Sequence, residues 1–331
     1  MHNEECIMPL EHLEILDHLE SLEYLDHLES LEYLDHLEKN NSKQMILYPN
    51  CKINIGLHIV GKRADGYHNL ETLFYPVYAL HDELEICPAD TFSFEQEGIA
   101  VDCPADDNLI IKCYHRMRNR YPQIGNVSIR FRKNIPFGAG LGGGSSDAAH
   151  TAIALNQLFG LGLSTEALAQ EVLPLGADCP YFIYNTPCYA EGIGDRLTPV
   201  DFSLSGMQLL LYKPACHVST KEAYAGIAIR EDIRGQILQA IRSEKPLSEI
   251  KDSLTNDFEQ TVFAKYPEIG ELKQRLIAEG AIYASMSGSG SAVFALFDTN
   301  ADFNGTIGQY QPIMQCVIRD EGNINYHIIR H

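Results

Sequence analysis

The feature that most constrains this chain is a glycine-dense loop that leads directly into an expected helix. Residues 136–147 read PFGAGLGGGSSD, and an alanine-rich segment, expected to be helical, runs from about Ser145 to Phe159. Glycines let the backbone approach an anion and direct successive N–H groups at it, and a helix start adds partial positive charge. We therefore expect a phosphate site here rather than a flexible linker, with Lys133 as a candidate contributor to its positive field.

The same glycines also satisfy the GxGxxG pattern of dinucleotide-binding folds. In that motif the loop follows its strand at once, and a second strand ends in an acidic residue about twenty residues further on. Here six residues separate Phe131 from Gly138, and the next element is a second helix with Ser164 as a plausible N-cap. This spacing argues against a dinucleotide fold, and the lack of a following Gly-Lys-Ser/Thr excludes a Walker A loop.

Composition narrows the class of protein and of partner. A chain of 331 residues with 45% apolar content can bury a large core, and its formal charge of −20 argues against a nucleic-acid or anionic-membrane surface. The nine cysteines are scattered and include no CxxC pair, so we expect them to be reduced packing residues. With no apolar stretch of about twenty residues and no secretory signal pattern, a cytoplasmic location is expected.

The amino-terminal segment has a different pattern from the rest of the chain. Residues 19–27 read LESLEYLDH, residues 28–36 repeat them, and residues 10–18 are a near copy. Leucine recurs at every third position, so the leucines of an α-helix would spiral around it and form no single core-facing stripe. Residues 1–44 also hold twelve acidic side chains against two lysines, half of the net charge. We expect this repeat to be a dispensable extension, with an oligomerisation or docking helix, or metal binding by its histidines, as the alternatives.

The body of the chain shows interleaved strands and helices without a regular βαβα rhythm, which favours an α+β fold of two domains with a boundary near residue 205. Periodicity predicts strands at 45–60, 73–87, 91–96, 127–131, 208–212 and 292–297. Helices are predicted at 107–121, 145–159, 164–173, 219–228, 231–242, 247–253 and 268–278. The stretch 192–206 is turn-rich, and the carboxy-terminal residues contain short β-like runs.

Several motifs together resemble a known superfamily. PFGAGLGGGSSDAA (136–149) resembles the phosphate loop of the GHMP kinases, which include galactokinase, homoserine kinase and mevalonate kinase. PNCKINIGLHIVGKRADGYHNLETLF (49–74), LGADCPYF (175–182) and SGSGSAVFALF (287–297) are similar to motifs of the GHMP kinases that act on 4-diphosphocytidyl-2-C-methyl-D-erythritol in non-mevalonate isoprenoid synthesis. The resemblance covers essentially all of 45–331. It implies the two-domain GHMP kinase fold, with 45–205 as the N-terminal and 206–331 as the C-terminal domain and the phosphate loop between them.

The resemblance also implies roles for particular residues. Lys52 matches the lysine beside the attacking hydroxyl and the γ-phosphate, and Asp178 matches the catalytic base, roles that suit an ammonium and a carboxylate in phosphoryl transfer. Substrate-binding positions are implied for Asn54, Tyr67, His68, Phe74 and Tyr224, with Tyr67 stacking on cytosine and His68 reading its polar edge. The implied ATP-binding residues are Pro136, Phe137, Gly138, Ala139, Gly140, Leu141, Gly142, Gly143, Gly144, Ser145 and Ser146.

The implied activity is ATP-dependent phosphorylation of the 2-hydroxyl of the cytidine-linked polyol. ATP is then the co-substrate and Mg²⁺ its companion, since Mg²⁺ neutralises the β and γ phosphates. The sequence has no dense carboxylate cluster for the metal, and either Ser145 or Ser146 is a candidate ligand. A small-molecule substrate is expected, while oligomeric state is not indicated. Another GHMP kinase activity and a catalytically inactive nucleotide-binding regulator are the alternatives, and the presence of both Lys52 and Asp178 argues against the latter.

Overall fold

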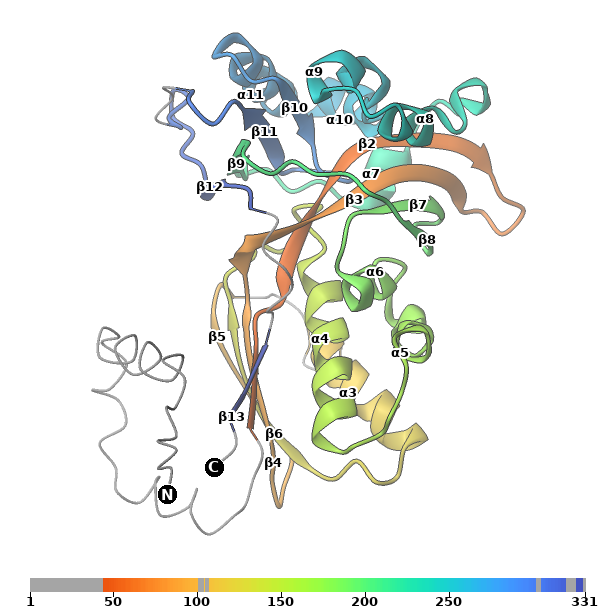
Figure 1. Ribbon diagram of the computed structural model, residues 1–331, viewed down its shortest axis with the longest axis vertical. Helices are drawn as coiled ribbons and strands as arrows, with labels where there is room; N and C mark the ends of the chain where they lie inside the picture. The colour runs from red at the N-terminus through yellow and green to blue at the C-terminus, as the bar shows by residue number, and fades with distance from the viewer. Residues whose placement is uncertain (1–43, 101–103, 105–106, 302–304, 320–325, 330–331) are drawn as a thin grey trace, which may run out of the picture. The chain divides into compact units, whose positions relative to one another are not determined.

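The computed structural model describes residues 44–100, 104, 107–301, 305–319 and 326–329, and side chains within all of these except 326–329. The predicted extension 1–44 therefore lies outside the described residues, apart from Gln44. Within Gln44–Ile329 the chain forms one compact unit by its internal contacts. Three sheets and the helices around them make up this unit (Figure 1).

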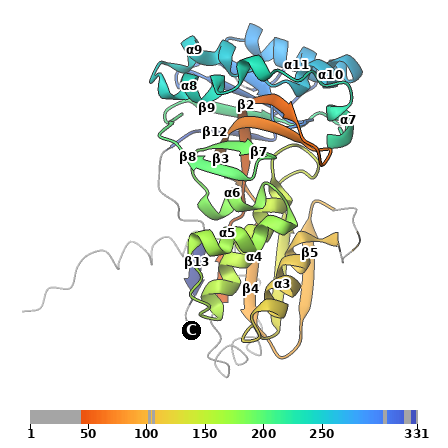
Figure 2. The ribbon, with the colours of Figure 1, turned by 90° about the vertical axis from the view of Figure 1, so that its right-hand side faces the viewer.

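The first sheet has the strand order β13-β1-β4-β6-β5. Its strands are β1 (Gln44–Leu47), β4 (Glu83–Pro88), β5 (Ser93–Gly98), β6 (Val127–Lys133) and β13 (Tyr326–Ile329), and only the β5–β6 pair is parallel. The helices α3 (Leu109–Arg120), α4 (Gly143–Leu158) and α5 (Thr165–Val172) lie on one side of it (Figure 2). Buried side chains of β1, β4 and β6 pack there against those of the helices, because each strand alternates buried and more exposed positions.

Two long strands lead away from this sheet. β2 (Asn50–Lys62) and β3 (His68–His81) pair antiparallel and begin the second sheet, of order β2-β3-β7-β8, with β7 (Cys188–Gly192) and β8 (Arg196–Pro199). Twelve of the thirteen residues of β2 are buried, so this strand is covered on both faces. Along the chain between α5 and β7 lie two short helices, η4 (Leu173–Leu175) and α6 (Cys179–Tyr184).

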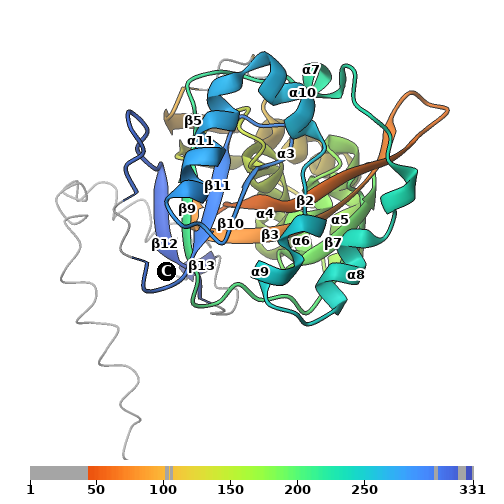
Figure 3. The same cartoon turned by 90° about the horizontal axis from the view of Figure 1, so that it is seen from above.

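The third sheet has the order β10-β11-β9-β12 and is antiparallel throughout. Its strands are β9 (Gln208–Tyr212), β10 (Tyr283–Met286), β11 (Val293–Phe297) and β12 (Met314–Val317). The associated helices, seen from above in Figure 3, are α7 (Thr220–Tyr224), η5 (Glu231–Ile233), α8 (Gln236–Arg242), α9 (Leu247–Ile250), η6 (Lys251–Ser253), α10 (Phe258–Lys265) and α11 (Pro267–Ala278).

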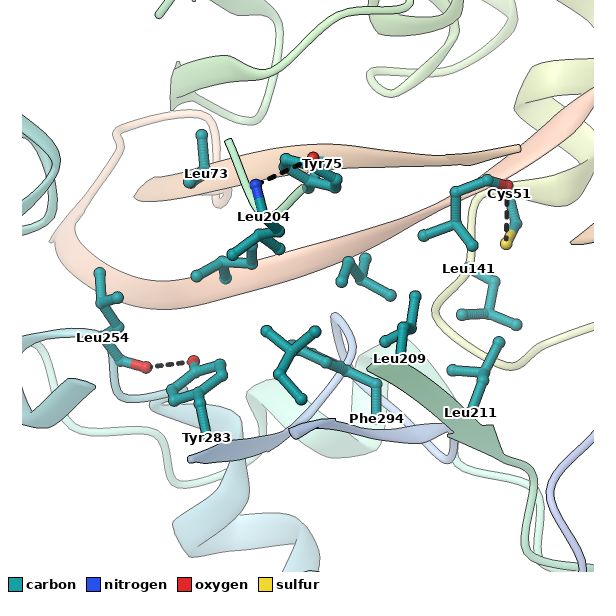
Figure 4. Close-up of a cluster of buried hydrophobic side chains, with 14 of the residues drawn as sticks. Cys51, Leu73, Tyr75, Leu141, Leu204, Leu209, Leu211, Leu254, Tyr283 and Phe294 are labelled. Carbon is teal, nitrogen blue, oxygen red and sulfur yellow. Dashed lines mark hydrogen bonds between the residues drawn. The ribbon is translucent and has the colours of Figure 1, made fainter. Parts of the chain in front are cut away.

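A large apolar core joins the second and third sheets. Leu73 and Tyr75 of β3 lie on one side of it and Leu209, Leu211 and Phe294 of the third sheet on the other (Figure 4). The helices α10 and α11 pack on the opposite face of the third sheet through a separate cluster. No helix among the described residues is both long enough and apolar enough to span a membrane.

Most predicted elements are present, with differences at proline and at short segments. The single strand predicted over 45–60 is divided, because Pro49 lacks the N–H that a continuous strand would use. The predicted strand 73–87 is also divided, with Asp82 between the end of β3 and the start of β4. The segment 192–206, predicted as turns, contains β8, and α6 and α10 were not predicted. The boundary near residue 205 stays a prediction, and β13 from the carboxy-terminal part pairs with β1 in the first sheet.

Candidate active site

The glycine loop runs from the end of β6 to the start of α4, and both of its flanks are anchored. Gly138, Gly140 and Gly142 all have positive φ, between 62° and 76°, a region in which other residues are strained. A Cβ at Gly140 would lie 2.0 Å from the carbonyl oxygen of Ser287, so this position has room only for glycine. Leu141 is buried in the core shown in Figure 4, which fixes the middle of the loop. The loop is thus a shaped backbone cradle, as a phosphate site requires.

Lys52 lies directly beside this loop. The residue is only 3% exposed, and its Nζ donates to the Asn54 Oδ1 at 2.6 Å and to the Gly140 carbonyl at 3.2 Å. The backbone N–H of Lys52 also donates to the Leu141 carbonyl. Gly142 approaches the Cε of Lys52 so closely that a Cβ there would be 3.2 Å away. Lys52 therefore lies in contact with the glycine loop, and its role beside the γ-phosphate stays a prediction.

Asp178 stands opposite Lys52, with its Oδ2 3.5 Å from the Lys52 Nζ. It precedes α6 at the N-cap position but makes no side-chain capping bond. About a third of the carboxylate side chain is exposed, at 32%. This carboxylate is not used to hold the helix, is accessible, and is paired with an ammonium. The ADCP segment could have been read as an ordinary helix cap, and the structure removes that interpretation.

Asn54 and Phe74, which were predicted to bind substrate, are buried against Lys52. Both are 2% exposed. The Asn54 amide accepts from Lys52 and donates to Thr72 Oγ1 at 3.0 Å, and the Lys52 Nζ lies 4.9 Å from the centroid of the Phe74 ring. Their visible contacts orient the lysine, and contact of either with a cytidine stays a prediction.

The other predicted substrate residues are Tyr67, His68 and Tyr224, and the first two lie next to each other in sequence at the start of β3. Tyr67 is 62% exposed in the turn between β2 and β3. His68 stacks on Tyr224, with ring centroids 4.8 Å apart and an angle of 15° between the planes, and Phe258 meets Tyr224 edge-on. Burial raises the pKa of Tyr224 to about 12, and the negative charge of Asp178 adds to this rise. The structure therefore brings two of the predicted rings, His68 and Tyr224, into contact, and Tyr224 lies within electrostatic range of Asp178.

Two residues that the sequence analysis did not single out, Ser287 and Asn256, support the glycine loop. The Ser287 hydroxyl donates to the Gly140 carbonyl at 2.9 Å. Asn256 donates through its Nδ2 to the Met286 and Gly288 carbonyls, which holds the Ser287 turn in place. The sequence signal was the SGSGS motif itself, and its contact with a loop about 150 residues away could not be derived from spacing.

The candidate metal ligands at the loop are the two serines that the sequence indicated, Ser145 and Ser146. Across the described part of the chain, no group of three His, Cys, Asp or Glu side chains is placed to hold an ion. Ser146 is fully buried, and its hydroxyl lies 3.3 Å from the His150 Nδ1. Ser145 is partly exposed. Of the two serines, the geometry favours Ser145 as a donor to an ion held by phosphates.

Comparison with known proteins agrees with this geometry. The profile of the GHMP kinases N terminal domain matches residues 108–186, and that of the GHMP kinases C terminal domain matches residues 237–304. A 4-diphosphocytidyl-2-C-methyl-D-erythritol kinase of Azobacteroides pseudotrichonymphae is 47% identical over 253 residues, covering 76% of this chain and 93% of the relative. A kinase of the same name from Bacteroides thetaiotaomicron is 48% identical over 258 residues, covering 77% and 92%.

The chain belongs to the 4-diphosphocytidyl-2-C-methyl-D-erythritol kinase family of the GHMP kinases. A crystal structure of 4-(cytidine 5'-diphospho)-2C-methyl-D-erythritol kinase superposes with a TM-score of 0.63 at 32% identity, covering 76% of this chain and 89% of that one. A homoserine kinase from Cytophaga hutchinsonii has a TM-score of 0.64 at 18% identity, covering 79% and 86%, which supports the GHMP fold alone. The predicted α+β GHMP kinase fold is confirmed.

Proposed function

We propose that this GHMP kinase transfers the γ-phosphoryl group of ATP to the 2-hydroxyl of 4-diphosphocytidyl-2-C-methyl-D-erythritol. The observation that carries the proposal is the Lys52 ammonium, which lies between the Asp178 carboxylate and the Gly140 carbonyl of the phosphate loop. Relatives at 46–48% identity are named for the kinase reaction on this substrate. The class of activity, an ATP-dependent small-molecule kinase, follows from membership of the family.

Asp178 is proposed to accept the proton of the attacking hydroxyl. Its carboxylate is partly exposed and makes no helix-capping bond, so it is open to a substrate alcohol. Proton acceptance raises the nucleophilicity of the alcohol oxygen as the bond to phosphorus forms. A buried Lys52 next to it offsets the charge that develops on the transferred phosphoryl group, and this effect is strong because water is largely excluded from the ammonium.

The glycine loop is proposed to hold the ATP phosphates through its backbone N–H groups and the start of α4. Mg²⁺ would be bound chiefly by the phosphate oxygens, with the Ser145 hydroxyl as the ligand from the protein. When bound, the ion neutralises phosphate charge. A cytoplasmic location is part of the same proposal.

Tyr67, His68 and Tyr224 are proposed to form the cytidine-binding end of the site. An exposed tyrosine and a stacked imidazole–phenol pair offer flat π surfaces and polar edges, which suit a pyrimidine base. The electrostatic influence of Asp178 on Tyr224 supports one continuous substrate site from the base to the reacting hydroxyl.

One assay tests the proposed function. Purified protein is incubated with ATP and Mg²⁺ and, in separate reactions, with the cytidine-linked polyol, mevalonate, galactose or homoserine, and ADP formation is followed. Among the four alcohols, we expect only the cytidine-linked polyol to raise ADP formation above the rate without an alcohol substrate. Equal or faster turnover of mevalonate, galactose or homoserine would replace the proposed substrate with that alcohol.

A further inference from the structure

A buried cluster of charges lies beneath the glycine loop and is not used by the proposed chemistry. Lys133, at the end of β6, is 3% exposed. Its Nζ donates to the Asp82 Oδ2 at 2.5 Å and to the Asp147 Oδ2 at 2.8 Å. Both aspartates are buried, at 0% and 4% exposure. The sequence suggested that Lys133 adds to the positive field of the phosphate site, but its ammonium is enclosed by two carboxylates, and the geometry makes it a poor direct ligand for phosphate.

The cluster joins three separate parts of the fold. Asp82 lies between β3 and β4, and its Oδ1 also accepts from the backbone N–H groups of Asn134 and Ile135, at 2.6 and 2.8 Å. Asp147 lies in the second turn of α4, three residues after the last glycine of the loop. Lys133 therefore links the junction between β3 and β4 to helix α4, which begins at the end of the glycine loop.

The loop itself comes close to the Lys133 ammonium. A Cβ on Gly143 would lie 3.0 Å from the Lys133 Nζ and 3.0 Å from the Ile135 Cγ2. This is tighter than ordinary van der Waals contact, so a side chain at this position would displace the ammonium or the loop. The position of the loop and the position of Lys133 are thus mutually dependent.

The two carboxylates are not equivalent. Both carboxylate oxygens of Asp82 accept hydrogen bonds, whereas the Asp147 Oδ1 is buried without a hydrogen-bond partner. Burial raises the pKa of Asp147 well above its usual range, and nearby Asp82 acts in the same direction against the opposing effect of Lys133. The hydrogen bond from Lys133 is therefore the one that ties the Asp147 side chain to the rest of the cluster.

We propose that Lys133, held by Asp82, is a positioning residue that fixes the start of α4 through Asp147 and thereby sets the geometry of the phosphate loop for ATP. This inference rests on the proposed function only in naming ATP as the ligand of the loop. Neither Lys133 nor Asp147 touches ATP in this proposal. Their effect is transmitted through the backbone of residues 138–144, whose N–H groups must point at the phosphates together.

The test uses Asp147, because Lys133→Met would leave two buried carboxylates without a counter-charge and could prevent folding. Asp147→Ala removes the link from α4 to Lys133 but leaves the Lys133–Asp82 pair intact. Asp147→Asn keeps an oxygen that can accept from Lys133. Glu171→Gln is the matched control, since Glu171 in α5 is also a buried carboxylate, bonded to Arg120 and Tyr121 away from the loop.

Two measurements separate the inference from the proposed function. The first is the Kd of Mg·ATP by calorimetry, without any alcohol substrate. Asp147→Ala should raise this Kd by about 5- to 20-fold, less than the roughly 10- to 150-fold worth of a hydrogen bond to a charged group, because the bond acts on ATP only through the loop. Asp147→Asn should recover the Kd to within about 2-fold of wild type. Glu171→Gln should leave the Kd at the wild-type value. Equal ATP affinity in Asp147→Ala and wild type, or equal losses in the Ala and Asn variants, would overturn the inference.

The second measurement is amide hydrogen exchange of a peptide covering residues 136–147 in the nucleotide-free protein. Asp147→Ala should speed exchange in this peptide and Glu171→Gln should not, whichever alcohol the enzyme phosphorylates. Unchanged exchange in Asp147→Ala would overturn the proposed tether even if the substrate assay succeeds. If the substrate assay fails while the loop responds as expected, the proposed function alone is lost.

Discussion

The two ends of the proposed substrate site are built in opposite ways. At the reaction end, Lys52 is 3% exposed and is held by the Asn54 amide, the Gly140 carbonyl and Asp178. At the base end, Tyr67 is 62% exposed, and His68 and Tyr224 stack on each other. The reaction end is preorganised, so its groups need little rearrangement as charge develops, whereas the base end offers surfaces that a ligand can reorder. Substitutions at the first end should therefore alter rate, and those at the second should alter affinity.

The largest effect is expected at the reaction end, from Asp178→Asn. The amide keeps the size of the side chain but cannot accept a proton, and loss of a general base typically lowers rate by about 10²–10⁴. The change should appear in kcat measured by ADP release, with KM for both substrates within a few-fold of wild type. Near-normal kcat would show that positioning and Lys52 suffice without a base.

The next effect concerns the stability of the reaction end in acid. His150 in α4 is buried one turn after Ser146, its Nδ1 donates to the Ser146 carbonyl at 2.9 Å, and burial lowers its pKa to about 4. Because this value lies below the ordinary value of 6.5, the contribution to stability is present above pH 6.5 and is lost as pH falls towards 4. The expected loss is about 3 kcal/mol, measured by denaturant unfolding across this range.

His150→Gln should reduce the dependence of the free energy of unfolding on pH between 6.5 and 4. Burial also lowers the pKa of His58 to about 4, so the variant should retain the share due to His58. An unaltered slope in His150→Gln would contradict the assignment of a neutral, buried imidazole to this position.

A smaller effect is expected at the base end, from Tyr67→Ala. Loss of a stacking surface costs about 1–3 kcal/mol per base, so KM for the cytidine substrate should rise while KM for ATP and kcat change little. His68→Ala should act in the same direction. Steady-state kinetics with each substrate varied in turn provide the measurement. Parallel increases in both KM values would place this cluster on the ATP side and erase the distinction between the two ends.

The smallest effect is expected from removing residues 1–44. Their leucine spacing cannot present one apolar face to a core, so a protein beginning at Met45 should keep its Tm and both KM values. Only Gln44 of β1 is lost from the described unit. A fall in Tm of more than about 5 °C, or a selective change at one end of the site, would show that the repeat is integrated with the kinase.

How much of this molecule is predictable from sequence depends on the range of the interaction. Helices with local signals were correctly placed, such as α5, whose predicted N-cap Ser164 does accept from the Ala167 N–H. The strand at 208–212 was also placed correctly, because its apolar run is bounded on both sides by polar and turn residues. The helix α10 was missed, since its eight residues have little amphipathic contrast.

The site shows the same dependence. Motif order brought Lys52, Asp178 and the glycine loop into one hypothesis, and the structure does place them in contact. The burial of Asn54 and Phe74 beside Lys52, and the enclosure of Lys133 by Asp82 and Asp147, could not be derived, because each depends on residues far apart in sequence. A lone lysine before a glycine loop looks the same whether it faces phosphate or a buried carboxylate.

The pairing of β13 with β1 bears on the order in which the chain can fold during synthesis. Strand β1 is among the first described residues to leave the ribosome, at 44–47, and its partner at 326–329 is among the last. Until β13 emerges, β1 presents one unpaired edge of backbone N–H and C=O groups to solvent, the kind of edge that can pair with other chains. Contacts of such long sequence separation also form slowly. The nascent protein therefore has an exposed strand for most of its translation, and a prematurely ended chain would keep it permanently.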